Sequence, residues 1–513
     1  MNGAKIAILI SIIAYLLLMI YIGYYFSKKG SGDSSDEFYL GGRKLGPIVA
    51  AMSAEASDMS GWLLMGLPGV AYLTGVCDAG WTAIGLAIGT YLNWLLVAKR
   101  LRKYTIVTNS ITLPDFFSKR FKDTKNILMC ISAIIIIVFF IPYTASGFKS
   151  VGTLFNSLFG VDYHLAMIIG AIVIVGYTIL GGFMAVSTTD LIQSIVMSIA
   201  LIVITLFALN VAGGLEAVSA NASNMDGYLS FSKMFDVSTG TSSSYGFITT
   251  CSTLAWGLGY FGMPHILLRF MAIEDEAKVA TSRRIASVWV VISMAVAIFI
   301  GVIGYSVSLK GNIPLFGTSA EAETVIIQIS SLLSENGIIF ALIAGVVLAG
   351  ILACTMSTAD SQLLTASSSV SQNLIQDVMK VKLDSKKSIL LARLTIIAIS
   401  ICAAFMAWNP NSSVFTIVSF AWAGFGASFG PLVLFSLYWK RMNLPGALAG
   451  MVSGALTIFV WKFMIRPLGG VWNIYELLPA FIVASVAIVV VSLITKAPSK
   501  EIEEEFEASK KVI

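Results

Sequence analysis

Charged residues are scarce in this chain: they make up 12% of its 513 residues, whereas hydrophobic residues make up 57%. A soluble protein of this length could not hide so much apolar surface around one or two cores. No polar stretch is long enough to form a separate water-soluble domain. The composition therefore indicates an integral membrane protein.

Histidine and cysteine are rare too. The two histidines, His164 and His265, form no HExxH pair, and the chain has neither a G-x-S-x-G elbow nor a P-loop. We therefore expect neither an enzyme nor a nucleotide-driven pump, and no organic cofactor. The five cysteines are scattered, mostly within apolar runs, and predict neither a disulfide framework nor a metal cage. The net charge of +5 comes without a basic domain, so we expect no nucleic-acid partner.

Apolar runs recur along the whole chain, each about as long as the 20 residues that an α-helix needs to cross roughly 30 Å of hydrocarbon. Barrel strands would give shorter, alternating runs. We therefore expect an all-α integral membrane protein with about 13 transmembrane helices. The first run, 5–26, has no small-residue cleavage site, so we expect it to be a retained span and not a signal peptide.

Lysine and arginine indicate the orientation, because cytoplasmic loops accumulate them. If the N-terminus lies outside, most of the 33 lysines and arginines fall in cytoplasmic segments, including KRLRK at 99–103 and RR at 283–284. We predict a multi-pass protein of the plasma membrane, surrounded by lipid, with the N-terminus outside and the C-terminus in the cytoplasm.

Two of the apolar runs contain glycine and proline residues that disfavour a continuous membrane helix. The run 46–73 contains ASDMSGW and then PG, and the run 246–268 contains WGLGYFGMPH. Each glycine or proline costs roughly 1 to 3 kcal/mol inside a helix, and unwound backbone at membrane depth survives only within protein or along a polar cavity. We therefore predict two discontinuous helices. The alternative is that Gly and Pro merely kink packed membrane helices.

The two interrupted runs lie five spans apart, which fits two five-helix units, the second inverted relative to the first, as in secondary transporters. The expected organisation is an extra N-terminal transmembrane helix and cytoplasmic loop (1–45), a first five-helix repeat (46–212), an external loop (213–245), a second repeat (246–440), two C-terminal transmembrane helices (441–496) and a cytoplasmic tail (497–513).

Ionisable and hydroxyl side chains at membrane depth are the candidates for an ion site. Asp58 is expected roughly 18 Å deep, where a charge costs about 3 kcal/mol unless partners, water or an ion offset it. The alternative is a structural carboxylate that caps broken-helix amides, with Ser57 and Ser60 assisting. A stripe on one helical face could offer oxygen to Na⁺, a hard cation, or could only pack helices together. Its members are Cys354, Ser357, Thr358, Ser361 and Thr365.

Two further aspartates remain open. Asp190 lies near the cytoplasmic start of its span, where it could serve ion access or cap a helix. Asp360 lies about 110° from the hydroxyl stripe, so we expect its carboxylate to face elsewhere. Proton coupling through Asp58, Asp190 or Asp360 stays possible, although the hydroxyl stripe favours Na⁺. Aromatic residues beside the breaks, Trp62, Tyr143, Trp256 and Tyr260, could shape a solute pocket or simply pack.

Several motifs resemble those of the sodium/solute symporter family, and SDMSGW with GLGYFG resembles its proline-carrying branch. The motifs are FYLGGRKLGP (38–47), SDMSGWLLMGLPG (57–69), ITLPDFF (111–117), WGLGYFGMPHIL (256–267), MST (356–358) followed by SQLL, and AWAGFGASFGP (421–431). The resemblance covers essentially the whole chain and implies a fold of the leucine-transporter type, with Na⁺ as coupling ion and L-proline as solute.

Residue roles follow from this resemblance position by position. It implies an Na⁺ site formed by backbone oxygens of Ala56 and Met59 with Cys354, Ser357 and Thr358. Support at the ion sites is implied for Asp58 and Asp190, and we expect the same of Ser361 from its place in the hydroxyl stripe. A proline pocket is implied at Ser60, Trp62, Tyr143, Trp256, Tyr260 and Pro264. A role in coupling is implied for Arg43.

The chain departs from the family pattern at Glu55 and Asp360, where small side chains are expected, so proton participation and the Na⁺ stoichiometry stay open. Two other functions also stay open: an Na⁺ symporter for another small solute, and a membrane sensor that binds solute and signals through its tail. The absence of an output domain in the sequence argues against the sensor.

Overall fold

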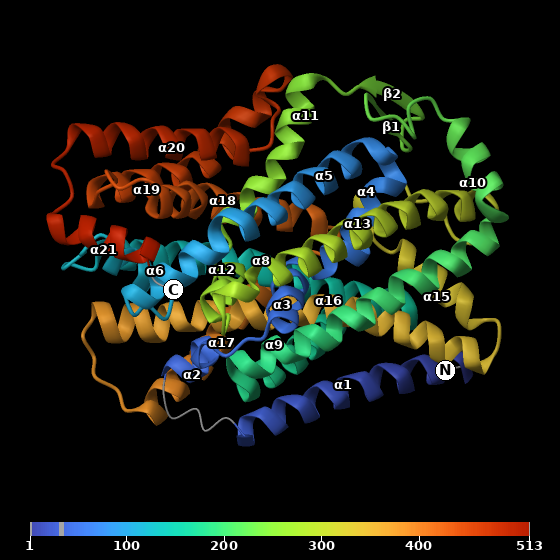
Figure 1. The fold of residues 1–513 in the computed structure, drawn as a ribbon. Coiled ribbons are helices and arrows are strands. Elements are labelled where there is room, and N and C mark those ends of the chain that lie inside the picture. Colours follow the sequence, from blue (N-terminus) through green and yellow to red (C-terminus); the bar gives the residue numbers. More distant parts are fainter. Residues whose placement is uncertain (1–2, 30–34, 512–513) are drawn as a thin grey trace.

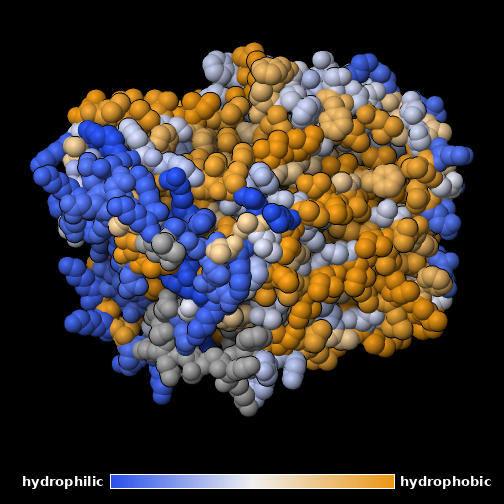
Figure 2. Space-filling view, in the orientation of Figure 1, coloured by the Kyte–Doolittle hydropathy of each residue, from blue (hydrophilic) through white to orange (hydrophobic). Residues whose placement is uncertain are grey.

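The protein is a bundle of long helices whose polar segments gather at its two ends. The structure is a computed structural model that describes residues 3–29 and 35–511. Most long helices run roughly along one direction (Figure 1). Hydrophobic residues cover much of the face shown in Figure 2, whereas hydrophilic residues concentrate at the end where α21 lies. This distribution is what a bundle needs to sit in hydrocarbon with both ends in water.

The elements of the first half follow the apolar runs. They are α1 (Gly3–Lys29), α2 (Ser35–Leu40), η1 (Gly41–Arg43), α3 (Pro47–Gly61), η2 (Trp62–Gly66), α4 (Leu67–Thr74), α5 (Val76–Leu92), η3 (Asn93–Ala98), α6 (Lys99–Val107), α7 (Leu113–Arg120), α8 (Ile127–Phe159), α9 (Tyr163–Ala212), α10 (Gly214–Ser223), and the strands β1 (Lys233–Asp236) and β2 (Thr241–Ser244).

The second half is helical throughout. Its elements are α11 (Phe247–Leu254), η4 (Ala255–Gly262), α12 (Pro264–Ala272), η5 (Glu276–Lys278), α13 (Val279–Leu309), α14 (Ser319–Ala322), α15 (Val325–Ser334), α16 (Ile338–Ser368), η6 (Ser369–Val378), α17 (Ser385–Met406), α18 (Val414–Tyr438), α19 (Leu444–Val460), η7 (Trp461–Ile465), η8 (Arg466–Leu468), η9 (Gly470–Trp472), α20 (Leu477–Ile494) and α21 (Lys500–Lys511).

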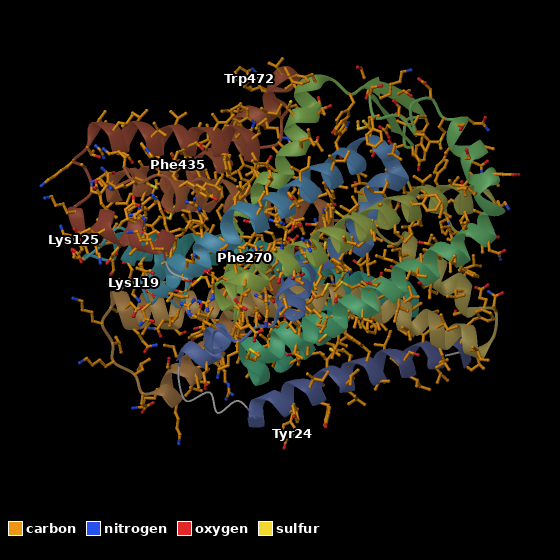
Figure 3. All side chains as sticks on the ribbon, in the orientation of Figure 1. Tyr24, Lys119, Lys125, Phe270, Phe435 and Trp472 are labelled. Carbon is orange, nitrogen blue, oxygen red and sulfur yellow. The ribbon has the colours of Figure 1, made fainter. Side chains whose placement is uncertain are left out.

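Within the described residues, 10 helices are long and apolar enough to cross a membrane. A shorter apolar helix covers Tyr163–Ile179, and α9 changes direction just after it, at Gly182, where φ is 61°. The runs 46–73 and 246–268 each divide into shorter helical pieces and are absent from the 10 for that reason. Side chains fill the spaces between the helices (Figure 3).

Two polar segments differ from the expectation. The stretch 213–245 contains α10 and also an antiparallel hairpin in which Lys233 pairs with Ser244. The tail forms the helix α21, in which Ile502 and Phe506 are buried. Phe506 lies edge-on to Tyr104 of α6, with ring centroids 6.3 Å apart. The tail therefore docks onto the bundle.

Glycines bring α5 and η4 into backbone contact. A Cβ atom on Gly257 would lie 2.1 Å from the carbonyl oxygen of Gly85, and one on Gly89 would lie 2.3 Å from that of Gly257. No other residue type fits at such distances, so this crossing positions η4 closely against α5.

Candidate functional site

The first interruption is one residue wide. Within α3, Ser60 has φ 44° and ψ −169°, and after Gly61 the chain resumes as the π-helix η2. The Ser60 amide donates to Thr358 Oγ1 (2.9 Å), and the Ser60 hydroxyl accepts from the Trp62 amide (3.1 Å). Gly61 is required beside it, since a Cβ there would lie 2.3 Å from Ser150 Oγ. The predicted break is present, and side chains satisfy the displaced amides.

The second interruption is longer. A 3₁₀-helix, η4, separates α11 from α12, and Met263 has φ −75° and ψ 108° before Pro264 opens α12. Two displaced carbonyls are capped by side chains that no sequence motif indicated. Trp422 Nε1 donates to Trp256 O (2.7 Å), and Asn93 Nδ2 donates to Tyr260 O (3.0 Å). Both predicted interruptions thus survive because neighbouring side chains supply the missing partners.

The two interruptions meet through Asp58. Tyr260 OH donates to Asp58 Oδ2 (2.6 Å), and Tyr143 OH donates to Asp58 O (3.0 Å). Asp58 is 6% exposed, and its Oδ1 has no hydrogen-bond partner among the described residues. A buried carboxylate oxygen without a donor favours a cation or a polar ligand nearby.

Oxygen atoms from α3 and α16 converge beside this point. Ser357 Oγ lies 2.8 Å from Ala56 O, and Thr358 Oγ1 lies 3.5 Å from the same atom. Both hydroxyls also contact Cys354 O, at 3.1 and 3.2 Å. The carbonyl of Met59, one turn along α3, accepts from the Trp62 amide. These carbonyl and hydroxyl oxygens are the ligand type that a hard cation prefers.

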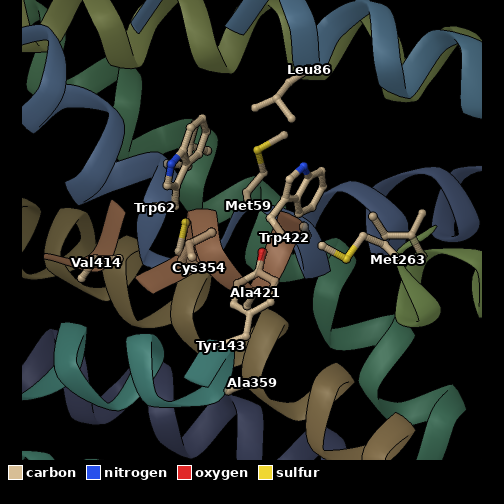
Figure 4. Close-up of a cluster of buried hydrophobic side chains, with 14 of the residues drawn as sticks. Met59, Trp62, Leu86, Tyr143, Met263, Cys354, Ala359, Val414, Ala421 and Trp422 are labelled. Atoms are coloured by element: carbon tan, nitrogen blue, oxygen red, sulfur yellow. The ribbon is translucent and has the colours of Figure 1, made fainter. Parts of the chain in front are cut away.

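Aromatic rings line the region between the interruptions. Trp62 and Trp256 have ring centroids 5.7 Å apart, and Tyr260 lies edge-on to Trp422 at 5.0 Å. Figure 4 shows Trp62, Met59, Cys354, Tyr143 and Trp422 drawn together around this space. Phe415 and Tyr475 contact Trp256 at 5.3 and 5.1 Å, which the sequence did not indicate because they come from α18 and from the segment before α20.

Ser361, the next hydroxyl of the stripe along α16, contacts a different group, the guanidinium of Arg269. Arg269 of α12, fully buried, pairs with Asp190 Oδ2 (3.2 Å) and donates to Ser361 Oγ (2.5 Å). Ser53 Oγ donates to Asp190 (2.6 Å) and accepts from Arg269 (3.0 Å). One guanidinium therefore connects α3, α9, α12 and α16. Arg269 was not among the predicted site residues, although an arginine within an apolar stretch is a visible signal.

Three other candidate residues are also buried and hydrogen-bonded. Asp360 is buried next to this network, and its Oδ1 accepts from Ser361 (3.4 Å). Glu55 accepts from Thr90 (2.8 Å) and Trp94 (2.9 Å) through Oε1. Thr365 donates to the carbonyl of Ser361 one turn back.

Arg43 is the last residue of η1, four residues before α3 begins. It donates to Met271 O (2.9 Å), Thr105 O (3.1 Å) and Ser110 O (2.5 Å). Arg43 thereby ties η1 to the end of α12, to α6 and to the segment after α6.

Comparison with known proteins gives consistent findings. Residues 38–454 match the sodium:solute symporter family. Over 504 residues the chain is 42% identical to the sodium/proline symporters of Staphylococcus aureus strains bovine RF122 / ET3-1 and USA300 / TCH1516, with 96% of this chain and 94% of each relative covered.

Solved structures share the fold. A Na⁺-coupled sialic acid symporter in a substrate-bound outward-open state matches with TM-score 0.79 at 17% identity, covering 96% of this chain and 99% of that one. A nucleobase-cation-symport-1 family transporter with bromovinylhydantoin bound matches with TM-score 0.54 at 12% identity, covering 92% and 98%. At these identities the likeness concerns the fold alone.

Proposed function

The chain belongs to the sodium:solute symporter family, and on that basis we propose that it couples inward Na⁺ movement to the uptake of L-proline by alternating access. It is an ion-gradient-driven transporter and not an enzyme. Its multi-pass helical fold places it in a membrane. Its 42% identity to sodium/proline symporters over 96% of its length supports proline as the solute.

The observation that carries this proposal is the convergence of Ser357 and Thr358 on the carbonyl of Ala56, one turn before the interruption at Ser60. Na⁺ would bind among these oxygens together with those of Met59 and Cys354. Asp58, whose Oδ1 has no partner among the described residues, would add negative charge nearby. Helix α3 and helix α16 would then be drawn together by the ion.

Proline would bind next to the ion, between the interruptions. Its ring would pack on Trp256 and Tyr260, with Trp62, Tyr143 and Pro264 completing the pocket. Its carboxylate would compete for the amides at Ser60 and Trp62, which side-chain oxygens now hold. Because linkage is reciprocal, Na⁺ and proline would each tighten the binding of the other.

The finer architecture belongs to the same proposal. We place 13 spans in the membrane: the 10 long apolar helices, the shorter helix Tyr163–Ile179 and the two interrupted helices. We assign 46–212 and 246–440 to inverted repeats. Asp190 and Ser361 would act through Arg269, because its guanidinium contacts both side chains. This guanidinium supplies part of the positive charge that a second ion would otherwise bring. Arg43 would couple the cytoplasmic ends of the moving helices.

Uptake of labelled proline into proteoliposomes tests the proposal. We expect uptake with an inward Na⁺ gradient and only background uptake with K⁺ in its place. Thr358→Ala should weaken apparent Na⁺ affinity by at least about tenfold, because one oxygen ligand is lost. Ser367→Ala is the matched control, since among the described residues that buried hydroxyl bonds only to Leu364 O within α16. Equal Na⁺ affinity in both variants would contradict the site.

A further inference from the structure

A groove on the outside of the bundle lies between α9 and α13. Its volume is about 540 Å³. The residues that line it are Met52, Ser198, Leu201, Ile202, Arg284, Ile285, Val288, Trp289, Ile292, Ser293 and Val296. Most of them are apolar, and Ile202, Val288 and Ile292 are exposed. A concave apolar surface that faces hydrocarbon is filled by whatever apolar chain lies next to it.

One end of the groove carries a single positive charge. Arg284 lies in the second turn of α13, is exposed, and has no hydrogen bond or ion pair with any described residue. Its neighbour Arg283 is held over the ring of Tyr91, with 5.3 Å between the guanidinium carbon and the ring centroid. The guanidinium of Arg284 is therefore available to an external anion. Arginine binds phosphate oxygens in pairs, which suits a lipid headgroup.

The length of the groove fits one leaflet. From Arg284 to Val296 the helix rises about 18 Å at 1.5 Å per residue, and half of a hydrocarbon core is about 15 Å thick. Trp289 is fixed across the groove by donating to Ser198 Oγ (3.0 Å), so both walls are held together at mid-length. A second apolar cavity, of about 230 Å³ and lined by Leu16, Phe155 and Met356 among others, includes no charged residue.

We propose that this groove is a binding site for an anionic phospholipid, with one acyl chain along α13 and the headgroup phosphate on Arg284. The lipid would also touch α3, the helix that carries the first interruption, because Met52 forms part of the groove wall. A bound acyl chain would therefore pack against α3 at Met52, five residues after the start of that helix.

Native mass spectrometry of the full chain, titrated with phosphatidylglycerol in detergent, tests this site. We expect one tightly retained lipid and weaker retention of zwitterionic phosphatidylcholine. Arg284→Gln should weaken retention of phosphatidylglycerol about fivefold, as expected for one basic contact with an anionic headgroup. Val288→Trp should displace the acyl chain and abolish retention. Both positions are exposed, so neither change disturbs the core.

Lys382→Gln is the matched control, because it removes an exposed positive charge outside the groove. The proposal is overturned if this control weakens retention as much as Arg284→Gln, or if phosphatidylcholine is retained as strongly as phosphatidylglycerol. It is also overturned if glycerol phosphate alone competes fully at equal concentration, since the acyl chain would then contribute nothing. A shift of Val288→Trp from dimer to monomer without loss of lipid would assign the groove to a second copy instead.

Discussion

Asp58 and Tyr260 join the two interruptions by a hydrogen bond. A carboxylate deep in an apolar run is visible in the sequence, because its insertion needs compensation. Its partner is not, because 202 positions separate the two residues and only the packed structure brings the phenol within 2.6 Å. The same holds for Trp422 and Asn93, whose roles depend on carbonyls that become available only when η4 forms.

Gly257 gives a prediction about close packing. Gly257→Ala should lower the stability of the protein by about 1 to 3 kcal/mol, because its Cβ would overlap the backbone of Gly85 and force the helices apart. Thermal unfolding in detergent measures this change. Gly176→Ala is the control, since nothing lies within 4 Å of a Cβ there. Equal unfolding temperatures for the two variants would show that α5 and η4 are not in contact.

Helices α3, α9, α12 and α16 are joined by the pair of Asp190 and Arg269. Asp190→Ala should destabilise the protein by about 3 to 5 kcal/mol, because it leaves a buried guanidinium without its counter-charge. Asp190→Ala combined with Arg269→Met should recover part of this loss, since the orphaned charge is gone. Unfolding temperature is again the measurement.

The control for this pair is Asp226→Ala, which breaks an exposed pair with Lys233 at 3.0 Å. Little change is expected there, because water and salt screen exposed pairs. A similar small effect at Asp190 would mean that Arg269 is solvated or rotates to another acceptor.

The C-terminal helix α21 docks by Phe506 and by ion pairs such as Lys440 with Glu503 (3.2 Å). Phe506→Ala should speed amide hydrogen exchange across residues 500–511 by about tenfold or more, because the helix loses its largest buried side chain. Glu504→Ala, at an exposed position on the same helix, should leave exchange unchanged. Unaltered exchange in the Phe506 variant would show that the ion pairs alone hold the tail.

Elements differ in how far the sequence predicts them. Long apolar helices and both interruptions were predictable, since length and Gly/Pro clusters are local signals. The hairpin β1–β2 was not, because four-residue strands in a Ser/Thr-rich loop carry no hydrophobic alternation. The docking of α21 was not predicted either. Ile502 and Phe506 repeat at helical spacing and are buried, but they are the only two large apolar residues in a mostly charged helix.

For the molecule as a whole, the distribution of lysine and arginine predicts its orientation. Lys119 and Lys125 lie at the end of the bundle that carries α21 (Figure 3). Green fluorescent protein fused after Ile513 should therefore fluoresce in the cytoplasm, and alkaline phosphatase fused after Gly240 should be active outside, because the 13 proposed spans put these sites on opposite sides. Fluorescence and phosphatase activity in the reverse pattern would refute the orientation.

Thr358 Oγ1 has two roles that cannot be separated. It belongs to the group of oxygens around Ala56, and it also accepts the amide of Ser60, the one residue at which α3 departs from helical geometry. In the proposed site, a cation bound to this oxygen would alter its hydrogen bond with the Ser60 amide, which holds the bend. If Na⁺ binds at the proposed site, its arrival would need no relay to reach the bend, because the oxygen that would bind the ion is the oxygen that holds the Ser60 amide.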